Sequence, residues 1–326
     1  MIIEFLLSLL VLCLTSSLCI LTSGGLIKEI IEPILLPAIL GILAVMIFLS
    51  GYGKSFLRIF YPPKKMKNTE LQELKKIDSA LGFAIRALIF ICGFIMLISA
   101  IYFYLNFDET QTLGFNLAVV IVSIFYLAFF GMIFLTLKGK NKTRIIKFMA
   151  DEAEPEKKNP VSKKQRILFI CKILISLVLI VGLYCLIIFT STVNHSGHEP
   201  LSFYYLRDVP GVIYIFIPPF LLLAISGNFK NFFKALKYAV TNTRLTVSQK
   251  AIYMNAVRLL GIIMLLEGIM TTLTGFLGML YNLEDRSALG INIAVACVPL
   301  IYALIINLIL LPIESKISLL SDSDSE

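Results

Sequence analysis

Apolar residues fill eight long stretches of the chain, and polar residues are concentrated in the segments between them. Each stretch is close to the roughly 20 residues that a helix needs to cross a bilayer. The stretches are apolar throughout instead of alternating in polarity, which favours helices over the strands of a membrane barrel. The pattern predicts eight transmembrane helices, approximately at residues 5–22, 33–50, 87–105, 113–137, 167–193, 209–226, 257–281 and 288–313.

Composition indicates the same class of protein. Of the 326 residues, 58% are hydrophobic and 15% are charged, and the mean hydropathy is +0.89. A soluble chain of this size would expose a very large apolar surface. We therefore expect an all-α integral membrane protein, and the apolar N-terminus, which has no basic segment before it, is read as the first span and not as a cleaved signal peptide.

The net charge of +8 is unevenly distributed along the chain. If the N-terminus is inside, the loops at 51–86, 138–172 and 230–258, together with Lys316, hold all but three of the 29 Lys and Arg. This bias follows the positive-inside rule and predicts cytoplasmic N- and C-termini. It also argues against nucleic acid as a partner, while the basic linker is expected to lie against anionic membrane lipids.

Reactive and metal-binding residues are sparse. The six cysteines lie in or beside apolar stretches without a CxxC pair, and are read as buried small hydrophobic residues. His195 and His198 have no third ligand nearby. Because the sequence also has no nucleotide-binding loop, zinc signature or hydrolase triad, we expect neither an enzyme nor a bound cofactor or metal.

The second half of the chain repeats the first at an offset of 176 residues. The matched positions are Gly51, Lys54, Leu113, Gly114, Asn116 and Tyr126, which correspond to Gly227, Lys230, Leu289, Gly290, Asn292 and Tyr302. Four crossings return a chain to its starting side, so both copies have the same orientation. The predicted domains are a four-helix repeat at 1–140, a charged linker at 141–166, a second four-helix repeat at 167–316 and an acidic tail at 317–326.

The last two helices contain the motif residues of a known family. They are Thr272 and Gly275 in the seventh helix, and Leu289, Gly290, Ala294, Val295, Asn307, Leu308, Ile309, Pro312 and Ile313 in the eighth. Over this stretch the sequence resembles the MotA/TolQ/ExbB proton-channel family, closest to the flagellar stator A subunit. The expected fold is then eight transmembrane helices in two parallel MotA-like repeats, without the large cytoplasmic domain of the flagellar proteins.

That resemblance implies a membrane subunit of a proton-driven, energy-transducing complex in the bacterial inner membrane. It also implies an oligomeric ring around a single-span partner similar to MotB, TolR or ExbD. A non-conducting membrane scaffold derived from the family is an alternative, as is a small-molecule or lipid transporter that uses the interface between the repeats.

Glu267 is the first candidate for ion chemistry, because a carboxylate inside a membrane span is costly. On a helix, Thr271, Thr274 and Gly278 lie within about 40° of it, whereas Thr272 lies about 140° away. Glu267 is read either as a proton-binding carboxylate or as a structural group hydrogen-bonded to a neighbouring helix. The predicted ion pathway comprises Glu267, Thr271, Thr272, Thr274, Asn292, Pro299 and Tyr302. For Asn292 and Tyr302, which recur in both halves, shared packing is the alternative.

Overall fold

The computed structural model describes residues 1–23, 31–60, 67–105, 110–150, 208–241, 245–280 and 286–319, and the isolated positions 167, 171 and 178. Every element in these ranges is an α-helix. The prediction of an all-α membrane protein is therefore confirmed for this part of the chain. Most of the predicted span at 167–193, residues 151–166 of the linker predicted at 141–166, and the acidic residues of the tail lie outside the described residues.

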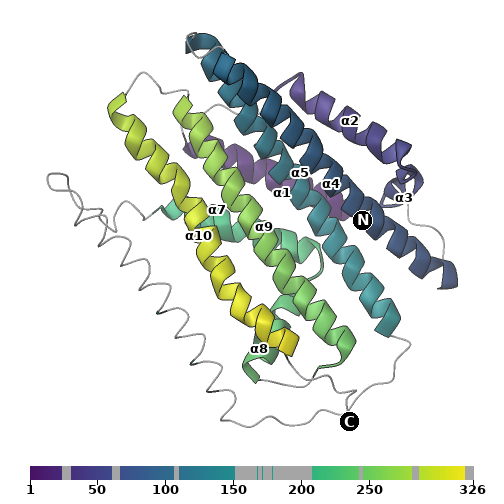
Figure 1. The fold of residues 1–326 in the computed structure, drawn as a ribbon. Helices are drawn as coiled ribbons and strands as arrows, with labels where there is room; N and C mark the ends of the chain where they lie inside the picture. Colours follow the sequence, from purple (N-terminus) through teal and green to yellow (C-terminus); the bar gives the residue numbers. More distant parts are fainter. Residues whose placement is uncertain are drawn as a thin grey trace.

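Four long helices form one layer of the molecule (Figure 1). They are α4 (Lys67–Leu105), α5 (Thr110–Ala150), α9 (Val247–Leu280) and α10 (Arg286–Leu319). They lie side by side in the order α10, α9, α5, α4, so that one long pair from each half of the sequence meets at the contact between α5 and α9. Most of the buried apolar side chains lie between these helices.

Shorter helices pack on this layer. Helix α1 (Ile2–Thr22) contacts α7 (Val209–Ile225), α9 and α5, so the first helix of the chain packs mainly on elements of the second half. Helix α2 (Leu35–Leu49) lies against α4 and leads into the short α3 (Gly53–Leu57). Helix α8 (Phe229–Thr241) follows α7 and packs against α9 and α10.

The number of spans differs from the prediction of eight. In the described residues, five helical segments are long and apolar enough to cross a membrane, and α7 with α8 forms a sixth if that pair, bent by 105°, is one span. The five segments are Ile2–Thr22, Leu71–Ser99, Leu117–Met149, Val247–Gly278 and Val295–Ser318. Helix α2 has only 15 residues. The structure therefore shows a multi-span helical membrane protein, with five or six spans in the part that it describes.

The segment before the third predicted span also differs from expectation. The spacing of Leu71, Leu74, Ile77 and Leu81 predicts a short amphipathic helix on the membrane surface. In the structure these residues belong to α4, which continues without a break into the span. Ile77 and Leu81 are buried in the main core, because the apolar stripe faces other helices instead of the bilayer.

Two corners in the chain have the same geometry. At the ends of α2 and α7, Gly51 and Gly227 adopt φ values of 78° and 73°, which only glycine reaches without strain. The N–H of Tyr52 donates to Ile47 O and the N–H of Asn228 donates to Leu223 O, both at 3.1 Å. The second corner follows the first by 176 residues, which is the offset of the sequence repeat.

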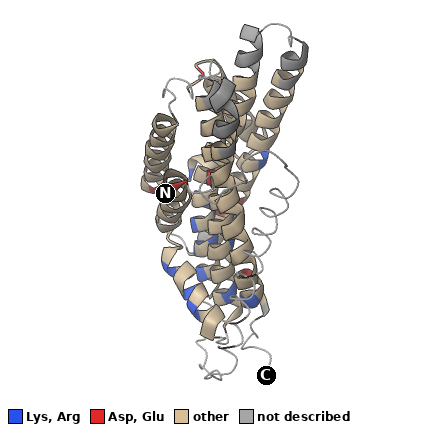
Figure 2. Cartoon of the chain, turned by 90° about the vertical axis from the view of Figure 1, so that its left-hand side faces the viewer, with Lys and Arg blue, Asp and Glu red and all other residues tan. Residues whose placement is uncertain are grey.

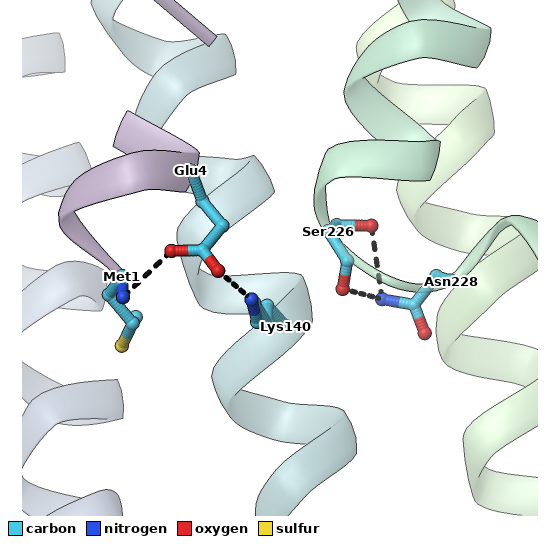
Figure 3. Close-up of polar contacts among 5 residues, drawn as sticks. All are labelled: Met1, Glu4, Lys140, Ser226 and Asn228. Atoms are coloured by element: carbon cyan, nitrogen blue, oxygen red, sulfur yellow. Dashed lines mark hydrogen bonds and ion pairs between the residues drawn. The ribbon is translucent and has the colours of Figure 1, made fainter. Parts of the chain in front are cut away.

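Charged residues gather at one end of the helix layer. Figure 2 shows most of the Lys and Arg toward the end where the C-terminus lies. At this end Lys140 of α5 pairs with Glu4 of α1, whose carboxylate also pairs with the amino group of Met1 at 2.7 Å (Figure 3). Arg258 of α9 pairs with Glu314 of α10. The start of α1 and the end of α10 thus lie toward the same basic end.

Candidate ligand site

A cavity of about 240 Å³ lies at the opposite end of the bundle, where α1 and α9 end and α7 and α10 begin. Backbone and side chains of four helices enclose it, and much of its lining is polar. The lining residues are Cys19, Thr22, Ser23, Asp208, Pro210, Gly211, Tyr214, Thr271, Gly275, Gly278, Val295, Ala296 and Pro299. The volume is slightly below that of drug-sized ligand sites, roughly 300–1,000 Å³, and suits a small molecule.

One face of α9 contacts α1 and forms a wall of this cavity. The Thr274 hydroxyl lies 2.8 Å from Cys19 Sγ, and a Cβ on Gly278 would lie 2.5 Å from the carbonyl oxygen of Ser23. Thr271 lies one turn before Thr274 and also lines the cavity. The helical spacing of the sequence therefore places these α9 residues toward α1.

Asp208 provides the acidic group of the cavity. It precedes α7 as the N-cap residue, but its side chain makes no capping hydrogen bond. Its backbone N–H donates to the hydroxyl of Tyr302 at 3.2 Å, which ties the start of α7 to α10. A Cβ on Gly211 would collide with Asp208 Oδ2, so glycine at this position leaves room for the carboxylate.

Two further groups supply oxygen atoms. Pro299 lies inside α10 and has no N–H, so the carbonyl of Val295, four residues earlier, lacks its helical hydrogen-bond donor. The hydroxyls of Tyr214 and Thr22 lie 3.2 Å apart across the contact between α7 and α1. The cavity therefore combines one carboxylate with hydroxyl and carbonyl oxygens, an arrangement that can accept hydrogen bonds from an ammonium group.

Glu267 lies below this cavity and not in its lining. It is one turn from Thr271, whose hydroxyl donates to the Glu267 backbone carbonyl at 2.8 Å. Its side chain is 1% exposed, and Oε2 has no hydrogen-bond partner among the described residues. The hydroxyls of Thr271 and Thr274 bond to backbone carbonyls and to Cys19 and not to the Glu267 side chain. The structure therefore supports neither the proton-binding nor the structural interpretation of Glu267 with a hydrogen bond.

The structure does not bring all the predicted pathway residues together. Gly268 and Gly275, on the same helical face as Thr272, lie against Ala303 and Ala296 of α10. Thr272 is buried on this face and does not line the cavity, and its hydroxyl has no partner among the described residues. Pro299 lines the cavity, whereas Tyr302 does not, although its hydroxyl accepts a hydrogen bond from the Asp208 backbone N–H. The backbone of Asn292 lies in α10, but its side chain is outside the described residues.

Sequence reasoning missed Asp208, Tyr214, Cys19 and Thr22. The sequence could have indicated Asp208, because it is an acidic residue directly before the Val-Pro-Gly start of an apolar stretch. The other three lie within apolar stretches and become polar lining only when α1 packs on α7 and α9. No cluster of three metal-ligating side chains occurs in the residues that were described, and His195 and His198 lie outside them.

Comparison with known proteins gives one family match. The family model of the serpentine type 7TM GPCR chemoreceptor Srv matches residues 106–238, less than half of the chain. No curated protein and no solved structure matches. The matched stretch includes Asp208 and Tyr214 of the cavity.

This match overturns the resemblance to the MotA/TolQ/ExbB family, and with it the proton-channel and stator functions; the scaffold and transporter alternatives gain no support either. Several motif residues have a packing role, since Gly275 lies against Ala296, and small residues are common wherever membrane helices pack closely. The Srv family is eukaryotic, so the bacterial inner membrane is not supported, and the cytoplasmic position of the termini stays a prediction. The ring and its single-span partner stay predictions. Over residues 106–238 the chain is similar to the Srv family of serpentine chemoreceptors.

Proposed function

We propose that this protein is a chemoreceptor-like membrane protein that binds a small, positively charged ligand in the cavity between α1, α7, α9 and α10. The observation that carries the proposal is the Asp208 carboxylate, which is the acidic side chain in the lining and makes no capping hydrogen bond. Around it, Tyr214, Thr22 and the Val295 carbonyl supply further hydrogen-bond acceptors. A protonated amine matches this set better than an anion or an apolar molecule.

The position of the cavity supports a receptor role. It lies at the end of the bundle away from Lys140, Arg258 and most of the other basic residues. Because basic residues concentrate on the cytoplasmic side of membrane proteins, the cavity then opens toward the outside. A ligand that arrives from outside reaches it without crossing the bilayer. The similarity of residues 106–238 to chemoreceptors agrees with this role.

Ligand binding can be tested with the purified full chain in detergent. Protonated primary amines of increasing size, and the alcohols of the same shape, are compared for their effect on the melting temperature. We expect amines to stabilise the protein and the alcohols to have little effect, because a ligand that binds the folded state stabilises it by an amount that grows with the logarithm of its concentration divided by its Kd. The Asp208→Asn variant should bind the best amine about tenfold more weakly or worse, since it loses a charged hydrogen bond.

The first half of the chain offers a matched control. Glu32 occupies the corresponding position before α2, and its N–H donates to Tyr126 at 3.0 Å as that of Asp208 donates to Tyr302. Glu32→Gln should leave amine binding unchanged. Equal stabilisation by amines and alcohols, or equal loss of binding in both variants, would contradict a specific cation site at Asp208.

The same correspondence supports an architectural proposal. The two glycine corners, and the hydrogen bonds of Tyr126 and Tyr302, repeat at the offset of 176 residues. These features favour a tandem duplication with halves near 1–140 and 167–316, although α5 continues to Ala150 and so crosses the first boundary. With α2 and residues 167–193 counted as spans, this organisation has eight crossings.

A further inference from the structure

The surface of α8 divides into three stripes. Its buried stripe contains Phe232, Ala235 and Ala239, which face α9 and α10. About 100° around the helix, Phe229 and Phe233 are 39% and 49% exposed. A further 90° or so around, Lys230, Lys234 and Lys237 form an exposed basic stripe. An exposed aromatic stripe beside a basic stripe is the pattern of helices that lie in a membrane interface.

The direction of α8 matches that pattern. It leaves the apolar α7 at an angle of 105°, so α7 and α8 do not form one straight span. If α7 crosses the membrane, α8 lies along its surface. Several contacts hold this direction. Asn228 accepts hydrogen bonds from Thr143 of α5 at 2.7 Å and from Asn231 at 3.1 Å, and its amide also donates to Ser226 (Figure 3). The helix is thus fixed to the bundle instead of being free to insert.

Ion pairing within the protein does not explain the lysine stripe. Among the described residues, none of Lys230, Lys234 and Lys237 forms an ion pair, although Arg58, Lys140 and Arg258 elsewhere do. Their helix, α8, lies toward the basic end of the molecule (Figures 1 and 2), where the positive-inside rule places the cytoplasmic leaflet. That leaflet carries anionic headgroups, which attract basic side chains close to the surface.

We infer that α8 is an interfacial helix that inserts Phe229 and Phe233 among the acyl chains and binds anionic phospholipid headgroups through Lys230, Lys234 and Lys237. A phospholipid matches both features of α8, because its headgroup can bind the lysines and its acyl chains can contact the exposed rings. A soluble anion would contact only the lysines. This inference does not depend on the ligand cavity, which lies at the other end of the molecule.

The chain has no Trp, which allows a specific optical probe. A Phe233→Trp variant is reconstituted in phosphatidylcholine vesicles that contain phosphatidylserine, with bromine on the acyl chains of one lipid or the other. We expect brominated lipid to quench the fluorescence of the introduced indole. Phosphatidylserine should quench more than its share of the bilayer predicts, because each lysine near the surface can enrich an anionic lipid by about fivefold.

Two sets of substitutions separate the lysine stripe from general charge. Lys230→Gln, Lys234→Gln and Lys237→Gln together should abolish the preference for phosphatidylserine while leaving quenching by phosphatidylcholine intact, which also shows that α8 stays folded. Lys75→Gln with Lys76→Gln, two exposed lysines on α4, should change nothing, because α4 lies at the other side of the helix layer from α9 and α10, on which α8 packs.

Three results would overturn the inference. The first is no quenching of the Phe233→Trp variant by either brominated lipid, which would place α8 outside the membrane. The second is a phosphatidylserine preference that survives the triple lysine substitution. The third is loss of the preference on addition of inorganic phosphate at millimolar concentration, which would show a site for free phosphate instead of a lipid headgroup.

Discussion

Glu267 carries a carboxyl group inside the helix bundle. It is 1% exposed and Oε2 lacks a hydrogen-bond partner among the described residues. A buried polar group without a partner costs about 1–3 kcal/mol of stability. Glu267→Leu, which removes this cost at similar volume, should therefore raise the melting temperature of the detergent-solubilised protein.

Thr272→Val provides the comparison on the same helix. The Thr272 hydroxyl is also buried and unpartnered among the described residues, but it is a smaller polar group and faces α10. This variant should be neutral or slightly stabilising. If Glu267→Leu instead lowers the melting temperature while Thr272→Val does not, the Glu267 carboxyl makes a stabilising contact, as one of the readings of the sequence holds.

Single residues could be placed from the sequence where helical geometry alone decides. The 100° step per residue separates Thr272 from Thr271 and Thr274, and the structure has them on different faces of α9. Helical geometry could not predict that Asp208 and Cys19 line the same cavity. Their proximity depends on how α1 crosses α7 and α9, and no local pattern in the chain encodes that crossing.

Polar contacts hold three elements together near the α7–α8 corner. Thr143 of α5 donates to Asn228 at 2.7 Å and accepts from Asn255 of α9 at 3.3 Å. Hydrogen bonds between membrane helices contribute on average about 0.6 kcal/mol and rarely more than about 1.7 kcal/mol. Thr143→Val removes both contacts and should destabilise the protein by about 1 kcal/mol, measurable as a lower melting temperature.

Thr136 on the same helix is a matched control. It is fully buried, and its hydroxyl donates at 2.8 Å to the carbonyl of Met132 within α5. Thr136→Val keeps the shape of the side chain and breaks no contact between helices, so its effect should be clearly smaller. Equal losses in the two variants would mean that the corner hydrogen bonds add nothing beyond burial of the threonine.

Helices were predictable as elements, but not how far they extend. Apolar length locates α1, α2 and α7 within a few residues, since each ends where polar residues begin. It places the start of α4 about 20 residues too late, because Ile77 and Leu81 face the core and not lipid. The MotA resemblance failed at this scale as well, since Gly275 and Ala296 satisfy a packing requirement shared by many membrane helices.

The contacts of the whole molecule place both ends of the described chain on the same side of the bundle. The start of α1 lies near Lys140 of α5, because Glu4 forms an ion pair with it. The neighbouring Gly139 accepts a hydrogen bond from Asn255 of α9. One turn along α9, Arg258 pairs with Glu314 near the end of α10. Both ends of the described chain therefore lie on the basic side of the bundle, which requires an even number of crossings between them.

An even number of crossings differs from a seven-span arrangement, in which the two termini lie on opposite sides. Epitope tags at the two ends of the full chain should both be reachable by antibody only after the cell membrane is permeabilised, because the positive-inside rule predicts that the basic end faces the cytoplasm. A tag at one end that is stained in intact cells, with the other protected, would indicate an odd number and would remove the eight-crossing duplication. Staining of both tags in intact cells would keep the even number but turn the cavity at Asp208 toward the cytoplasm, so the same experiment decides from which side a ligand would enter.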